Sequence, residues 1–94
     1  MIECELTVKN RLGLHARPAS LFVQITNKYK SKIRVIKDHL EVDGKSIMGL
    51  LMLAAPMGTV LKAVIEGEDE DQLAEHLKKL FADRFGEDTD YQVT

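Results

Sequence analysis

The spacing of apolar residues changes several times along this chain, and the order of those changes limits the folds it can adopt. Near the start, apolar side chains alternate with polar ones at Ile2, Cys4, Leu6 and Val8. This alternation is typical of a half-buried strand. From residue 16 the spacing becomes helical, and the expected buried face consists of Ala19, Phe22, Val23 and Thr26. We therefore predict a strand over residues 2–8 and a helix over about 16–27.

The remaining elements follow from the same periodicities and from turn residues. Two strands are expected around 33–35 and 40–42, joined by a two-residue turn at Asp38-His39. Ser46 precedes a short apolar run over 47–53, which suits a brief buried helix, and a fourth strand follows over 61–66. Acidic residues at 69–71 begin the last helix, Gly86 ends it, and its apolar stripe is Leu73, Leu77, Leu80 and Phe81.

The predicted order is β-α-β-β-α-β-α, which indicates an α+β protein. Strands with one polar face favour an antiparallel sheet with the helices packed on its other face, an open-faced β-sandwich. A chain of 94 residues suffices for one domain. We expect that domain over residues 1–86 and an acidic, flexible tail over 87–94.

Charge is unevenly distributed along the chain. Residues 1–65 carry ten Lys/Arg and five Asp/Glu, a net of +5, whereas residues 66–94 carry three and ten, a net of −7. The first part could present a basic face to an acidic partner. Nucleic acid is a poor candidate partner, because no Lys/Arg cluster is present and the acidic end would repel a phosphate backbone.

Two further features bear on the cellular compartment. The longest apolar stretch, 50–57, is far shorter than the roughly 20 residues that span a bilayer, and no secretory signal is visible at the start, so no membrane insertion is expected. The single cysteine, Cys4, cannot form an internal disulfide, which favours a cytoplasmic location.

His15 is the strongest candidate for chemistry. It lies between the loop 10–14 and the predicted helix, where free backbone N–H groups and the positive end of the helix dipole meet. That environment favours the neutral, nucleophilic imidazole and an anion beside it. Arg17 can offer several donors to phosphate oxygens, and Pro18 suits the first helical turn. The alternative interpretation is a capping histidine beside a surface arginine.

The other reactive residue types give weaker signals. Ser46 before a helix is most simply a structural N-cap, although a phosphoryl group there would add charge beside Ile47 and Met48. His39 is expected in an exposed turn and His76 at the boundary of the last helix. No histidine pair has metal-ligand spacing, so we expect no metal site.

Two motifs at a fixed separation resemble the HPr family, the histidine-containing phosphocarriers of the bacterial phosphoenolpyruvate-dependent sugar phosphotransferase system. The first is Gly13-Leu14-His15-Ala16-Arg17-Pro18-Ala19-Ser20 and the second is Lys45-Ser46-Ile47-Met48-Gly49. The resemblance covers residues 1 to about 86 and implies the strand order 1-4-2-3. It also implies phosphoryl transfer without a cofactor.

The resemblance further implies roles for individual residues. His15 would accept a phosphoryl group on Nδ1 from phosphorylated enzyme I and pass it to an enzyme IIA domain, while Arg17 would steady it, supported by Ala16 and Pro18. Ser46 would be the site of a regulatory HPr kinase/phosphorylase. The residues that would dock partners, including a transcriptional regulator, are Ile47, Met48, Ser20 and Leu51.

Two alternatives stay open at this point. The protein could be a signalling relay or an interaction module switched by phosphorylation at Ser46, with no direct role in sugar uptake. A self-contained hydrolase is disfavoured, because no carboxylate pair, Ser-His-Asp set or metal set accompanies His15. Gln24 stands where some family members carry a basic residue, which implies less support for Arg17.

Overall fold

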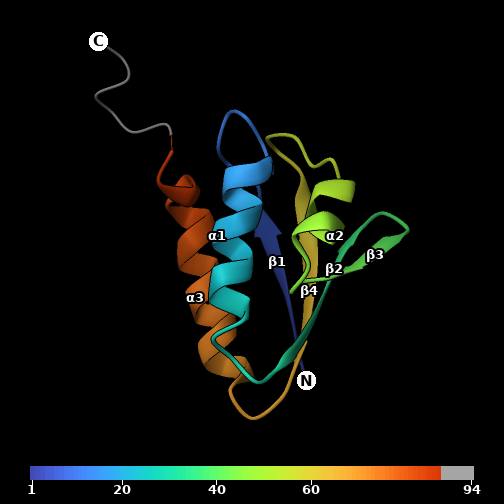
Figure 1. The fold of residues 1–94 in the computed structure, drawn as a ribbon, viewed down its shortest axis with the longest axis vertical. Coiled ribbons are helices and arrows are strands. Elements are labelled where there is room, and N and C mark those ends of the chain that lie inside the picture. The colour runs from blue at the N-terminus through green and yellow to red at the C-terminus, as the bar shows by residue number, and fades with distance from the viewer. Residues whose placement is uncertain (88–94) are drawn as a thin grey trace.

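The computed structural model describes residues 1–87 and contains the predicted elements in the predicted order (Figure 1). The strands are β1 (Ile2–Thr7), β2 (Lys32–Lys37), β3 (Leu40–Asp43) and β4 (Val60–Glu66). The helices are α1 (Ala16–Thr26), α2 (Ile47–Met52) and α3 (Glu70–Ala82), and a 3₁₀ turn, η1 (Arg84–Gly86), follows α3. The part of the predicted tail beyond residue 87 lies outside the described residues.

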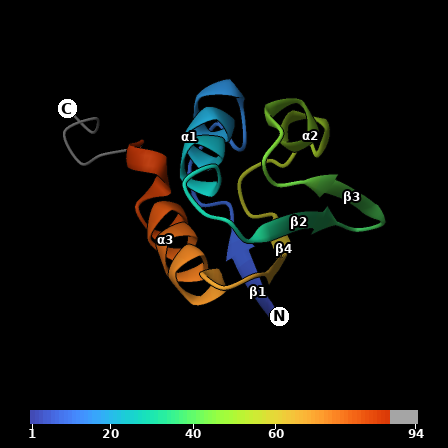
Figure 2. The ribbon, with the colours of Figure 1, turned by 60° about the horizontal axis from the view of Figure 1, so that its bottom comes forward.

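The four strands form one antiparallel sheet in the order β1-β4-β2-β3. Ala63 on the central strand β4 pairs with Cys4 of β1 on one side and with Val35 of β2 on the other. The three helices lie on the same face of this sheet (Figure 2). The predicted open-faced β-sandwich and strand order are therefore confirmed.

The core lies between the sheet and the helices. Alternate strand residues enter it, as the period-two pattern predicted, and α1 contributes Phe22, which is fully buried. The ring of Phe22 meets that of Phe81 from α3 edge to face, with 6.0 Å between the centroids. Burying a side chain of this size stabilises the fold by about 1.5–3 kcal/mol. This packing fixes α1, and with it His15, relative to α3.

The short helix α2 differs from its prediction as a buried element. Only Leu50 is fully buried, whereas Met48 is 71% and Met52 64% exposed. The helix has six residues and packs against α1 and β3 at the edge of the sandwich. So short a helix packs against its neighbours with one face only. The apolar side chains on its other face, such as Met48 and Met52, remain on the surface.

The end of the last helix also differs from its prediction. The α-helix stops at Ala82 instead of continuing to Gly86, because Arg84 and Phe85 both adopt left-handed backbone conformations with φ 55°. Phe85 is nevertheless 1% exposed, and its ring centroid lies 4.7 Å from that of Phe81. The buried ring anchors the 3₁₀ turn and returns the chain towards the start of α1.

Candidate functional site

The loop before α1 packs against the segment after α2 and so positions His15. Gly13 has φ 73°, and a Cβ there would lie 2.5 Å from the Ala55 carbonyl oxygen. Glycine therefore satisfies both the backbone conformation and the close approach. The next residue, Leu14, donates its N–H to the same Ala55 carbonyl at 2.9 Å and is buried. These contacts place the following residue, His15, at the end of a well-anchored segment.

His15 is the N-cap residue of α1, and its side chain makes no capping hydrogen bond. The first intrahelical bond runs from the Ala19 N–H to the His15 carbonyl. The N–H groups of Ala16 and Arg17 consequently have no acceptor within the helix, and Pro18 has no N–H. The residues with free N–H groups directly follow His15 at the positive end of the helix dipole, and the His15 side chain makes no bond of the kind a capping histidine would make.

The imidazole of His15 and the guanidinium of Arg17 are linked through one carboxylate. The side chain of His15 is 37% exposed and that of Arg17 is 53% exposed. Oε2 of Glu87 lies 3.0 Å from Nε2 of His15 and 3.0 Å from Nη1 of Arg17. Nη1 also donates to the Phe85 carbonyl at 2.8 Å. Residues of α1 and of the segment after α3 thus form one site.

Asn10 connects this carboxylate to the loop. Its side chain is fully buried, and Nδ2 donates both to the Gly13 carbonyl at 2.7 Å and to Oε1 of Glu87 at 2.9 Å. Sequence reasoning missed Asn10, Phe85 and Glu87 as site residues. Glu87 was expected in the flexible tail. Its only signal in the sequence is its position as an acidic residue directly after Phe85 and Gly86, where the last element ends.

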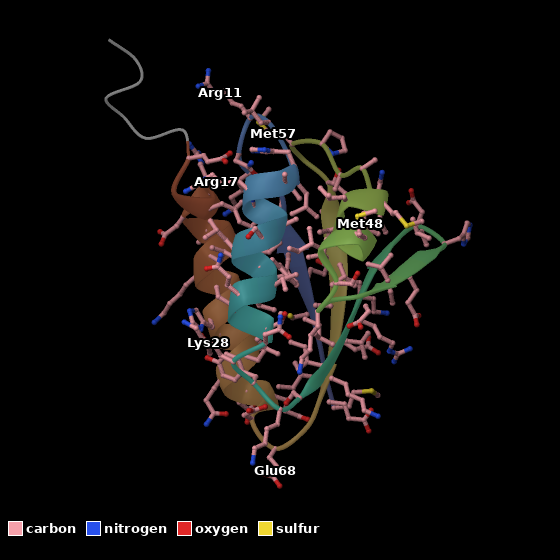
Figure 3. All side chains as sticks on the ribbon, viewed as in Figure 1. Arg11, Arg17, Lys28, Met48, Met57 and Glu68 are labelled. Carbon is pink, nitrogen blue, oxygen red and sulfur yellow. The ribbon has the colours of Figure 1, made fainter. Side chains whose placement is uncertain are left out.

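Ser46 and the predicted docking residues belong to α1 and to the start and body of α2. The Ser46 Oγ accepts the Gly49 N–H at 3.0 Å, so it caps α2 as expected of a structural serine. Ile47 is 40% exposed, whereas Ser20 and Leu51 are only partly exposed. The exposed apolar residues that sequence reasoning did not single out include Leu12, Met52 and Met57. Figure 3 shows Met57 at the same end of the molecule as Arg17.

The remaining reactive groups lie away from His15. His76 contacts the hydroxyl of Tyr29 through Nδ1 at 2.9 Å, and His39 is exposed in the turn between β2 and β3. Burial raises the pKa of the Cys4 thiol, which disfavours the reactive thiolate.

Among residues 1–87, no group of three His, Cys, Asp or Glu side chains could hold a metal ion. Nor does any helix in that range have the length and hydropathy needed to cross a membrane.

Fold and site together define a class: a small open-faced sandwich that displays one half-exposed imidazole, beside an arginine, at the start of a helix. Residues 2–83 match the family described as "PTS HPr component phosphorylation site". The chain therefore belongs to the HPr family, as its two motifs predicted.

Individual relatives agree with this assignment. The chain is 48% identical over 89 residues to phosphocarrier protein HPr of Xylella fastidiosa, covering 95% of this chain and all of that one. It is 46% identical over 77 residues to the HPr-like protein Crh of Halalkalibacterium halodurans, covering 82% and 92%. The crystal structure of HPr-C-His from Thermoanaerobacter tengcongensis superposes with a TM-score of 0.90 at 45% identity, covering 95% and 100%.

Proposed function

We propose that this protein is a phosphocarrier that uses His15. It accepts a phosphoryl group from phosphorylated enzyme I, for which phosphoenolpyruvate is the donor, and passes it in the cytoplasm to an enzyme IIA domain of a sugar phosphotransferase system. The observation that carries the proposal is the half-exposed His15 imidazole at the start of α1, next to Arg17. Membership of the HPr family supports the same chemistry.

The proposed transfer makes one bond and breaks one. The Nδ1 lone pair of His15 attacks phosphorus, and the bond from phosphorus to enzyme I breaks with its electron pair returning to the donor. Most of the catalysis in such transfers comes from positioning and from stabilising the charge on the phosphoryl oxygens. The N–H groups of Ala16 and Arg17 and the Arg17 guanidinium supply that stabilisation.

Two surface features suit docking to a larger protein. Met48 and Ile47 expose apolar area on α2, and Ser20 and Leu51 border it. The excess of basic residues in positions 1–65 complements an acidic partner surface. Exposed apolar side chains grouped on one element are typical of a surface where a partner protein docks.

The test is phosphorylation by enzyme I and phosphoenolpyruvate. We expect an acid-labile phosphoryl adduct on the wild-type protein and none on His15→Ala. The matched control is His39→Ala, which removes an exposed histidine from the β2–β3 turn and should leave the adduct intact. An adduct that persists in His15→Ala would refute the proposed role of this residue.

A second candidate function is favoured by Ser46. Its hydroxyl lies at the start of α2, directly before the exposed Ile47 and Met48, so a phosphoryl group there would add negative charge to the proposed docking surface. In this role an HPr kinase/phosphorylase modifies Ser46, and the modification changes binding to enzyme I or to a transcriptional regulator. The protein would then act as a signalling relay.

This second candidate predicts an acid-stable adduct formed with ATP and such a kinase. Ser46→Ala should prevent that adduct without preventing the acid-labile one. Ser46→Asp, which introduces a negative charge at the same place, should weaken binding to enzyme I. Unchanged affinity of Ser46→Asp for every partner tested would contradict the switch.

A further inference from the structure

We propose that Glu87 is a positioning residue for His15: its carboxylate holds the proton on Nε2 and thereby leaves Nδ1 as the nucleophilic nitrogen. The inference deepens the proposed function, on which the choice of Nδ1 rests. Glu87 lies beyond residues 2–83, the part of the chain that the family match covers.

The first step of the argument is the contact itself. Both carboxylate oxygens of Glu87 face Nε2 of His15, Oε2 at 3.0 Å and Oε1 at 3.3 Å. An ionised carboxylate can only accept hydrogen bonds, and a neutral imidazole carries a proton on one nitrogen alone. Nε2 must therefore be the donor, which leaves the lone pair of the ring on Nδ1. A carboxylate orients a ligating or catalytic histidine in the same way at other sites.

The second step is that the carboxylate is itself fixed in place. Its side chain is only 14% exposed, and Asn10 and Arg17 each donate to it. Arg17 also donates to the carbonyl of Phe85, whose ring is buried in the core. Glu87 is therefore bound from the loop, from α1 and from its own anchored turn, so its position relative to the imidazole is well defined.

The buried amide of Asn10 supports the same conclusion. Within residues 1–87, Oδ1 of Asn10 has no hydrogen-bond partner, and leaving a buried acceptor unpaired is unfavourable. Exchanging Oδ1 and Nδ2 would place an acceptor against the carbonyl of Gly13 and against the carboxylate of Glu87. The Gly13 carbonyl and the Glu87 carboxylate therefore fix the orientation of the Asn10 amide. One of the two hydrogen bonds that Nδ2 donates holds Glu87 in place.

The third step concerns Arg17. One oxygen, Oε2, contacts both Nε2 of His15 and Nη1 of Arg17, so the carboxylate fixes the ring and the guanidinium relative to each other. Within residues 1–87 the hydrogen bonds of the Arg17 guanidinium use Nη1, which leaves Nε and Nη2 as donors for a phosphoryl group. The carboxylate therefore prepares the acceptor nitrogen and the stabilising cation together.

The experiment compares Glu87→Ala and Glu87→Gln with the wild-type protein. The matched control is Glu68→Ala, an exposed glutamate at the opposite end of the molecule from Arg17 (Figure 3). Nitrogen-15 NMR of the unphosphorylated protein identifies the protonated ring nitrogen of His15. Initial rates of phosphorylation by enzyme I and phosphoenolpyruvate give kcat and KM for the carrier.

The wild type and Glu68→Ala should show a resolved Nε2–H signal from His15. Glu87→Ala should lose that signal, and kcat should fall about tenfold with little change in KM, a typical effect of removing a group that orients a functional histidine. Glu87→Gln, whose carbonyl oxygen can still accept from Nε2, should restore the signal and part of the rate.

An unchanged Nε2–H signal in Glu87→Ala would overturn the inference, as would an unchanged kcat. A faster rate would also overturn it, because it would show that the carboxylate competes with the incoming phosphoryl group. If no variant and no wild-type protein accepts phosphate, the proposed function fails. The NMR comparison then still decides whether Glu87 holds the ring.

Discussion

Replacing Phe85 should destabilise the protein more than its place near the end of α3 suggests. Its side chain is 1% exposed and packs against Phe81. Replacing a buried phenylalanine by alanine typically costs 3–5 kcal/mol, and we expect about 3 kcal/mol here, because the turn can close partly over the vacated space. For a domain of this size that corresponds to a fall in Tm of about 12–24 °C.

The left-handed backbone of Phe85 provides a second comparison. At φ 55° alanine carries a conformational cost of about 1–2 kcal/mol that glycine does not. Phe85→Gly should therefore be at least as stable as Phe85→Ala, although glycine is usually the more destabilising of these two replacements. Urea unfolding measures both variants against Leu12→Ala, which removes a side chain that is 74% exposed. A loss below about 1 kcal/mol in Phe85→Ala would refute the reasoning.

Three further predictions concern local structure. Gly13→Ala should cost about 2 kcal/mol or more and exceed the cost of Gly58→Ala in urea unfolding, because both glycines have positive φ but only a Cβ at Gly13 would meet the Ala55 carbonyl. Ser46→Ala should cost about 1 kcal/mol through loss of the N-cap, and Ser46→Asn much less; equal losses would contradict the capping role. The Ser31 hydroxyl and the Lys30 N–H lower the pKa of Asp69, so the stability that this carboxylate confers is present above the usual aspartate pKa and is lost as pH falls through the lower folded value. The free energy of unfolding of Asp69→Asn, measured across an acid pH series, should lack this pH-dependent contribution.

Local periodicity predicted most of the fold. Alternation over residues 2–8 and helical spacing over 19–26 identified the buried faces of β1 and α1, because each pattern depends only on neighbours along the chain. The short helix α2 was predicted from its apolar run, but its exposure was not. A run of apolar residues indicates a helix without showing how much of it the rest of the fold covers.

The candidate site was only half predictable. His15 and Arg17 lie next to each other in a recognisable motif, so the sequence shows them together. Glu87 is 72 residues from His15, and its approach depends on the end of α3 and on two left-handed residues that helical periodicity does not reveal. Contacts of this kind depend on tertiary packing, which no local pattern specifies.

The location of the phosphoryl group after reaction with enzyme I tests the account most directly. Fragmentation mass spectrometry of the phosphorylated protein identifies the modified residue, and nitrogen-15 NMR identifies the modified ring atom. The account predicts a single phosphoryl group on Nδ1 of His15, with the proton still on Nε2 facing Glu87. A phosphoryl group on Nε2, on His76 or on any other side chain would contradict it.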